Sequence, residues 1–419
     1  MGYTYDINTA KKDNISGNCL FACHTIGTVI SCFISTFLVA YIYQFSNGTF
    51  DYVYKVGIYN LCVYVTFLVS YPLFSFITDK TNRVWVYRAA QIIRLAFIIS
   101  IIFYGKQLAR LLPVAGLIYG LSEACYYASY NVLKQEMVSR TKMTRFAVLS
   151  SVAGKIMNII TPITLGALIQ VSTYEQTSIY VAVILGIIVF LSFWIRARKP
   201  DGSSFSVKRY FAKLKENPQA RQKIMFMYKT VLIYGFTTIT ATLVNVCIML
   251  QFNSTLSLGS IASIIEIIGI VQLLLLVKFT KPGKRSWVYA ICMFLPLISS
   301  LLFVIAPSKT TVIIYNVLMS LSSVLYGATL DIYRNATLKE AGLYSEIAEH
   351  QTVFECLLTV TRVISITILI LVSLTQKLVL FYILLVVFSL SYSAINICML
   401  IYEKKFCKPT IPPREIKKD

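Results

Sequence analysis

Twelve apolar runs, each about 20 residues long, divide this chain into hydrophobic segments joined by polar ones. A helix of that length crosses the hydrocarbon core of a bilayer, and in lipid every backbone polar group must be satisfied within the segment. The pattern therefore predicts an all-α integral membrane protein with twelve transmembrane helices. The expected spans are residues 20–44, 52–77, 85–104, 112–133, 146–171, 177–195, 224–250, 258–278, 286–306, 310–332, 350–374 and 378–402.

Composition and charge fix the class and the orientation. Only 14% of the 419 residues are charged, against about 25% in soluble domains. The net charge of +21 would favour a nucleic-acid partner in a soluble protein. Here 30 of the 39 lysines and arginines fall in segments expected on one side, and only four fall in the opposite loops. Such a bias marks the cytoplasmic side, so we expect both termini and the central linker there, with no nucleic-acid partner.

Two segments about 200 residues apart repeat each other. The stretch "TDKTNRVWVY" lies between the second and third expected spans, and "TKPGKRSWVY" lies between the eighth and ninth. A second echo matches "LSEACYYASYNV" in the fourth span with "LSSVLYGATLDI" in the tenth. Parallel repeats of this kind are related by an axis along the membrane normal. They predict a six-helix half at 1–195, a basic linker at 196–223 and a second six-helix half, with a basic tail, at 224–419.

The repeated halves and the first of these loops resemble the major facilitator superfamily of transporters. Its loop between helices two and three reads roughly G-x-x-x-D-[RK]-x-G-[RK]-[RK], and Asp79, Lys80 and Arg83 match it here. Ser75 and Asn82 stand at the glycine positions. The resemblance implies that Asp79 joins a charge contact between the halves that stabilises the outward-open state. The alternative is that the cluster only holds the loop in the cytoplasm.

The loop between the eighth and ninth spans keeps less of this motif. Gly283 and Arg285 match it, whereas Lys281 replaces the acid. The same resemblance places the first, fourth, seventh and tenth helices around a central cavity and implies transport by alternating access.

Charged residues inside spans are functional candidates, because each costs about 2.5–3.5 kcal/mol to insert. Three acids and three bases lie well inside the expected spans, and equal numbers favour pairing. They are Glu123, Glu266, Glu355, Arg94, Lys155 and Arg362.

Glu123 is the first of three residues that lie on one helical face of the fourth span. Tyr127 and Tyr130 follow at i+4 and i+7 and share that face, with Asn131 beside it. The resemblance implies that this face lines the cavity. The alternative is a structural ion pair between Glu123 and Lys155.

The other intramembrane charges lack an obvious partner within their own helix. Lys155 and Asn158 share a face of the fifth span, and Lys155 needs either a carboxylate or a substrate anion. Glu355 and Arg362 are seven residues apart in the eleventh span, about 10 Å along the axis, which is too far for a direct pair. The repeat offset places Lys155 opposite Glu355 in the two halves. Glu266 is the candidate for reversible protonation, because burial disfavours a charged carboxylate.

The remaining polar residues favour structural roles. Arg94 is expected outside the cavity. His24 is more often a hydrogen-bonded interface residue than a proton relay. Asn60, Asn245 and Asn316 fit substrate binding and helix contacts equally well.

These features predict a secondary transporter, proton-coupled, that exports or flips an amphiphilic or anionic organic substrate. The alternative is a non-transporting accessory or sensor protein with the same fold. The discriminating observation is whether Glu123, Lys155, Glu266, Glu355 and Arg362 converge on one cavity. An enzyme is not expected, because no catalytic constellation or phosphate-binding loop is present. We also expect no cofactor and no metal, and the ten cysteines fit small buried apolar residues.

The sequence also carries expectations about the central linker and about the membrane in which the protein lies. Basic and apolar residues alternate with a partial helical period in 196–223, which favours an amphipathic helix on the anionic inner leaflet. The other possibility is a solvated tether. We expect a monomer in the plasma membrane of a bacterium.

Overall fold

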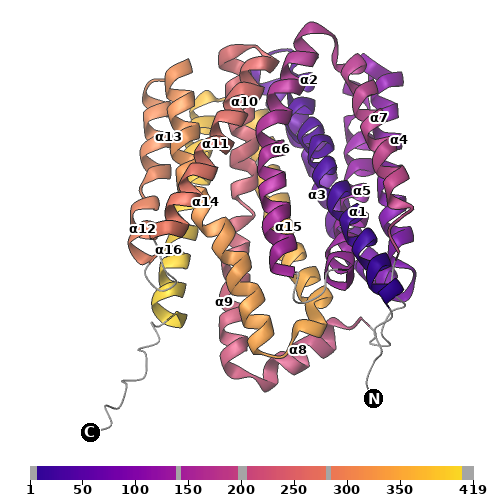
Figure 1. Cartoon of the computed structure of the whole chain (residues 1–419). Helices are drawn as coiled ribbons and strands as arrows, with labels where there is room; N and C mark the ends of the chain where they lie inside the picture. Colours follow the sequence, from indigo (N-terminus) through magenta and orange to yellow (C-terminus); the bar gives the residue numbers. More distant parts are fainter. Residues whose placement is uncertain (1–6, 138–142, 197–204, 280–284, 408–419) are drawn as a thin grey trace.

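The computed structural model describes residues 7–137, 143–196, 205–279 and 285–407, and this part of the chain is helical without a strand (Figure 1). The first half contains α1 (Ile7–Cys32), the π-helix η1 (Phe33–Phe37), α2 (Leu38–Gln44), α3 (Thr49–Lys80), α4 (Arg83–Tyr104), η2 (Gly105–Arg110), α5 (Leu112–Met137), α6 (Met143–Val171) and α7 (Tyr174–Ser192). The linker contains α8 (Val207–Glu216). The helices that follow are α9 (Pro218–Tyr234), α10 (Thr237–Phe252), α11 (Thr255–Phe279), α12 (Ser286–Cys292), α13 (Leu295–Ile305), α14 (Lys309–Glu340), η3 (Tyr344–Glu346), α15 (Ile347–Leu374) and α16 (Leu378–Phe406).

Ten of the twelve expected spans are confirmed as helical segments long and apolar enough to cross a membrane. In the described residues these are Ile15–Gln44, Thr49–Lys80, Arg83–Tyr104, Val152–Val171, Tyr174–Ser192, Pro218–Phe252, Thr255–Gln272, Ser286–Ile305, Ile347–Leu374 and Leu378–Phe406. The fourth and tenth expected spans correspond to the helices α5 and α14. Their passage through the membrane stays a prediction.

Helix starts follow ordinary capping chemistry. The side chain of Asn82 accepts a hydrogen bond from the backbone N–H of Val84 at the start of α4, and Thr173 does the same for α7. Asn217 caps α9, whose first residue is Pro218. Asn and Thr satisfy backbone donors that the first helical turn leaves free, and proline has no such donor to lose.

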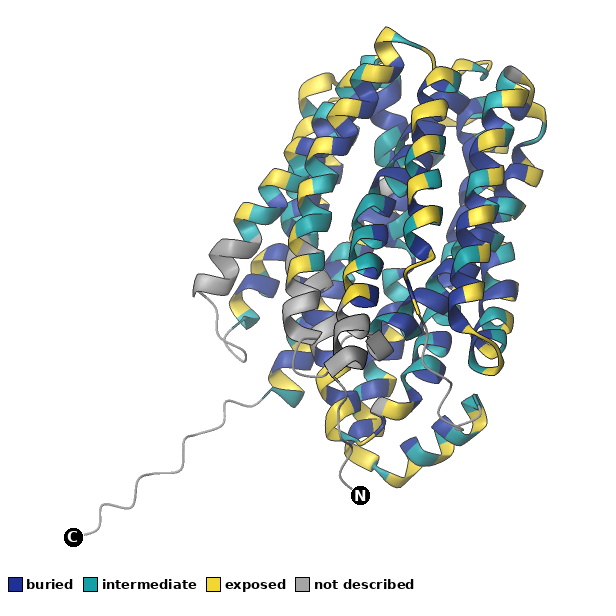
Figure 2. Cartoon of the chain, turned by 45° about the vertical axis from the view of Figure 1, so that its right-hand side comes forward, coloured by how far each residue is buried: buried dark blue, intermediate teal, exposed yellow. Residues whose placement is uncertain are grey.

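The outer surface of the bundle is apolar. Side chains such as Val69, Phe103, Val183, Ile305 and Val379 are mostly exposed, and exposed residues line the outward faces of the helices along their length (Figure 2). Apolar surface of this extent is unfavourable in water. The chain is therefore a multi-pass membrane protein whose surroundings are lipid.

The start of α1, the end of α16 and the linker helix α8 all lie at one end of the bundle (Figure 1). We call it the linker end. This arrangement agrees with two chain ends and a linker on one side of the membrane, and the assignment of that side to the cytoplasm stays a prediction.

Two helix pairs form the main contacts between the halves: α3 packs on α15, and α6 packs on α11. Glycine permits the second contact. A Cβ atom on Gly259 would lie 2.0 Å from the carbonyl oxygen of Pro162, and one on Gly166 would lie 2.7 Å from that of Thr255. Small residues let membrane helices approach this closely.

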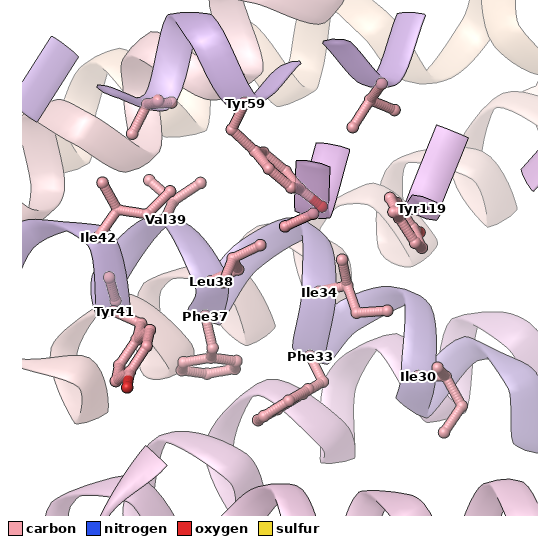
Figure 3. Packing of buried hydrophobic residues seen from close by; sticks show 14 of the residues in the cluster. Ile30, Phe33, Ile34, Phe37, Leu38, Val39, Tyr41, Ile42, Tyr59 and Tyr119 are labelled. Carbon is pink, nitrogen blue, oxygen red and sulfur yellow. The ribbon is translucent and has the colours of Figure 1, made fainter. Parts of the chain in front are cut away.

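Large apolar side chains from one face of the first span fill the core of the bundle. Phe33, Phe37 and Leu38 are fully buried and pack near Tyr59 of α3 and Tyr119 of α5 (Figure 3). Because this face of the first span packs in the core, polar residues of the span lie on its opposite face.

The glycine contact predicts an asymmetric mutational response. Gly259→Ala should lower the free energy of unfolding by about 1–3 kcal/mol, because the new methyl group meets a backbone carbonyl. Thermal unfolding in detergent measures it. The control is Gly186→Ala in α7, where a Cβ atom meets nothing within 4 Å. Equal melting temperatures for the two variants would contradict the contact.

Candidate functional site

A cavity of about 530 Å³ lies between the two halves. Its walls come from α1, η1, α5 and α6 on one side and from α10, α11, α14 and α16 on the other. The volume falls within the range of small-molecule sites. The lining is rich in uncharged polar side chains, among them Thr28, Ser31, Ser35, Asn158, Asn245 and Asn316.

One ion pair crosses this cavity from half to half. The Nζ atom of Lys155 in α6 lies 2.5 Å from Oε2 of Glu266 in α11. The two side chains are 33% and 27% exposed, and both line the cavity. Among the described residues that line it, these two are the only Lys, Arg, Asp or Glu side chains. The pair therefore presents one cation and one anion to whatever enters.

The backbone around the pair is held firmly. The hydroxyl of Ser263 donates to the carbonyl of Ile159 at 2.6 Å, and the hydroxyl of Thr255 donates to the carbonyl of Gly166 at 3.2 Å. Both bonds join α11 to α6. The close helix contact thus positions Lys155 and Glu266 against each other.

Glu123 lies outside the cavity lining, contrary to expectation. It forms a buried ion pair with Arg94 of α4, not with Lys155. The reason is helix order: α5 packs on α4, whereas α6 packs on α11. Arg94 is 2% exposed and also lies over the ring of Tyr126, 4.0 Å from its centroid. Arg94 thus lies outside the cavity lining, as expected from the sequence.

A histidine links this buried pair to the cavity. Nδ1 of His24 and the hydroxyl of Tyr126 are 2.8 Å apart, and the His24 ring stacks on Tyr130 at 4.3 Å between centroids. His24, Tyr126 and Tyr127 line the cavity, whereas Tyr130 is buried behind them. Asn131 instead donates to the hydroxyl of Tyr71 at 3.4 Å.

Glu355 and Arg362 of α15 also lie outside the cavity lining. Glu355 accepts a hydrogen bond from Gln351 at 2.9 Å. Nε of Arg362 donates to the hydroxyl of Thr238 at 3.0 Å, and its guanidinium lies over the Tyr64 ring at 5.2 Å. Of the five charged residues whose convergence on one cavity was to distinguish a transporter, only Lys155 and Glu266 line the cavity.

At the linker end, Asp79 accepts a hydrogen bond from the backbone N–H of Phe205 at 2.7 Å. Its other oxygen lies 4.0 Å from Nη2 of Arg83. Lys80 lies over the ring of Phe76 at 4.2 Å. Asp79 of the first half therefore binds the start of the segment that leads into the second half.

In the second copy of this loop, Lys281 and Gly283 lie outside the described residues. Arg285 directly precedes α12.

The expected linker helix is present as α8, and its apolar face packs on protein. Tyr210 and Leu214 are buried in a cluster with residues of α9 and α15. Burial raises the pKa of the Tyr210 hydroxyl to about 12, and this hydroxyl lies 2.9 Å from Nδ1 of His350. Lys208 and Lys215 are exposed. Their contact with the anionic inner leaflet stays a prediction.

Charge pairs fix α8 to α15 and to the turn before it. Glu349 accepts from the N–H of Ser206 at 3.0 Å and lies 3.6 Å from Arg209. Lys213 donates to Glu346. Burial works to raise the pKa of Glu346, but the hydrogen bonds from Lys213 and Ser345 outweigh it and hold that pKa below the usual range.

Within the described residues, no group of three or more His, Cys, Asp or Glu side chains could hold a metal ion.

Comparison with known proteins places the chain in a family. The profile described as Major Facilitator Superfamily matches residues 19–345. The chain belongs to this superfamily of transporters.

One curated relative is a Bacillus subtilis (strain 168) protein, "Uncharacterized protein YqgE", which is 26% identical over 243 residues. The match covers 56% of this chain and 55% of that protein, so the chain spans about half the length of this relative.

Solved structures share the fold over almost the whole chain. A POT family transporter in complex with 5-aminolevulinic acid gives a TM-score of 0.68 at 11% identity, covering 94% of this chain and 96% of that one. The nucleoside transporter NupG gives 0.64 at 13%, covering 93% and 100%. The human organic anion transporter MFSD10 gives 0.61 at 12%, covering 92% and 99%. At these identities the likeness establishes the fold alone.

The buried pair predicts a stability effect separate from transport. Glu123→Gln should lower the free energy of unfolding by about 3–5 kcal/mol, because it leaves the Arg94 guanidinium buried without its countercharge. Thermal unfolding measures it. The double variant Arg94→Met, Glu123→Gln should recover much of the loss. A Glu123→Gln protein as stable as the parent would contradict the pairing.

Proposed function

We propose that this protein is a secondary active transporter that carries a small polar organic substrate by alternating access. The observation that carries the proposal is the Lys155–Glu266 pair, which joins the two halves inside a cavity built by both. A substrate that binds there contacts both halves at once. Its binding energy can therefore bias the arrangement of one half against the other.

We propose further that the transport is coupled to protons through Glu266. A proton on this carboxylate removes its charge and ends the attraction to Lys155. The contact between the halves then weakens. One carboxylate thus links proton binding, substrate binding and the arrangement of the helices.

The character of the lining supports a polar organic solute over a lipid-like amphiphile. Hydroxyl and amide groups such as Ser31, Asn158 and Asn316 favour a solute that forms hydrogen bonds. Structures with the same fold include transporters named for organic anions and for nucleosides, and one with bound 5-aminolevulinic acid. Export, as expected from the sequence, remains part of the proposal, with the bacterial plasma membrane as its site and a monomer as its form.

The second candidate is an accessory or sensor protein that has kept the fold. The placement of Glu123, Glu355 and Arg362 outside the cavity lining favours it, because a transporter was expected to gather all five charged groups. The charged pair within the cavity favours transport.

Transport is tested in proteoliposomes with a pH dye inside and a panel of organic anions, amino acids, drugs and a fluorescent glycolipid outside. Glu266→Gln and Lys155→Gln should each reduce substrate-dependent proton movement about tenfold or more, because each removes a charge-assisted bond. The control is Glu340→Gln, which loses an exposed contact with Lys223 far from the cavity. A full response from Glu266→Gln would contradict proton coupling at this site, and silence from the whole panel would favour the accessory protein.

We propose that Asp79 acts on the conformational change rather than on binding, since it holds the backbone of Phe205 between the halves. Asp79→Asn should lower the transport rate and leave the substrate affinity unchanged. Rates and saturation curves from the same liposomes measure both. Lys80→Gln is the control from the same loop, and a weaker affinity in Asp79→Asn would contradict this role.

A further inference from the structure

The charges that line the cavity constrain the substrate. Lys155 supplies the cation and Glu266 the anion, and they satisfy each other at 2.5 Å. A substrate that reaches either group must compete with the other. Breaking a partly buried ion pair is unfavourable when one charge is left without a partner.

We propose that the substrate is a small zwitterion that bears a primary ammonium group and a carboxylate. This proposal rests on the proposed transport function and names its substrate class. The carboxylate replaces Glu266 as the partner of Lys155, and the ammonium replaces Lys155 as the partner of Glu266. Both protein charges stay paired, and the net charge of the occupied cavity does not change.

Substrates of one sign fit this cavity less well. An anion that binds Lys155 leaves the carboxylate of Glu266 without its cation, and a cation at Glu266 leaves Lys155 without its anion. Among the described lining residues no other full charge takes up either role. The neutral hydroxyl and amide groups nearby, including Asn158 and Ser320, suit the polar body of such a molecule.

Because the two charges belong to different halves, binding of the zwitterion would change the contact between the halves. Lys155 belongs to α6 of the first half and Glu266 to α11 of the second. A zwitterion inserted between them replaces a direct contact between the halves with one through the substrate. A proton on Glu266 competes with the ammonium group for the same carboxylate. A proton that enters the cavity therefore displaces the substrate. Such an exchange of an incoming proton for an outgoing substrate is what export requires.

Binding is tested with the purified full chain by ligand-induced shifts of the unfolding temperature. The probes are one pool of amino acids and short peptides in three forms: free, N-acetylated and methyl-esterified. The free pool contains zwitterions, the acetylated pool anions and the esterified pool cations. The parent protein should respond to the free pool with an apparent affinity about tenfold higher than for either blocked pool.

Two variants turn this into a test of geometry. Glu266→Gln keeps Lys155 and should shift the preference to the acetylated pool, and Lys155→Gln should shift it to the esterified pool. The double variant Lys155→Gln, Glu266→Gln keeps an uncharged pair and should lose the discrimination between pools. Glu340→Gln should behave as the parent.

Three results would overturn the inference: equal responses to the free and blocked pools, no response to any pool, or unchanged preferences in both single variants. The transport assay separates its failure from that of the proposed function. If an organic anion is transported with protons but the free pool does not shift the unfolding temperature, only the zwitterion inference is contradicted. Silence in both assays contradicts both proposals.

Discussion

The absence of water from the bilayer core is the constraint on which this structure depends. It forces the backbone into helices, and it makes every charge inside the bundle costly unless a partner is near. The chain meets the second demand in different ways. Arg94 and Glu123 neutralise each other within one half and lie outside the cavity lining. Lys155 and Glu266 neutralise each other between the halves, and both side chains line the cavity.

Close helix packing makes the second pair possible. Gly166 and Gly259 bring α6 and α11 into backbone contact, and the hydroxyl of Ser263 adds a bond between them. The charged pair follows on the same two helices. The stability of the bundle and its proposed function therefore share one interface. The segment that leads into α8 adds a separate connection between the halves, from Phe205 to Asp79.

The sequence was sufficient to predict ten of the spans, because the length of an apolar run that crosses a bilayer is set by the thickness of that bilayer. It also predicted the linker helix, whose alternation of basic and apolar residues is local. It did not predict that Tyr210 and Leu214 would pack on the protein, since a periodic pattern shows that a face is apolar without showing what covers it.

The site was harder to predict for a physical reason. Spacing within one helix shows that Glu123, Tyr127 and Tyr130 share a face, but not which helix lies opposite. Lys155 bonds to Glu266, 111 residues away, and nothing local to either residue specifies that partner. His24 was assigned a structural role because a single histidine carries no pattern. His24 shares one face of the first span with Thr28 and Ser31, and this polar face could have indicated that His24 lines the cavity.

The most direct test of the account is an exchange of the two charges. Lys155→Glu and Glu266→Lys, each alone, place two like charges together in the cavity and should lower the melting temperature of the protein. The chain that carries both changes restores an opposite pair between α6 and α11. The account predicts that this chain regains most of the lost thermal stability. A doubly exchanged chain whose loss equals the sum of the two single losses would contradict a direct pair between the halves.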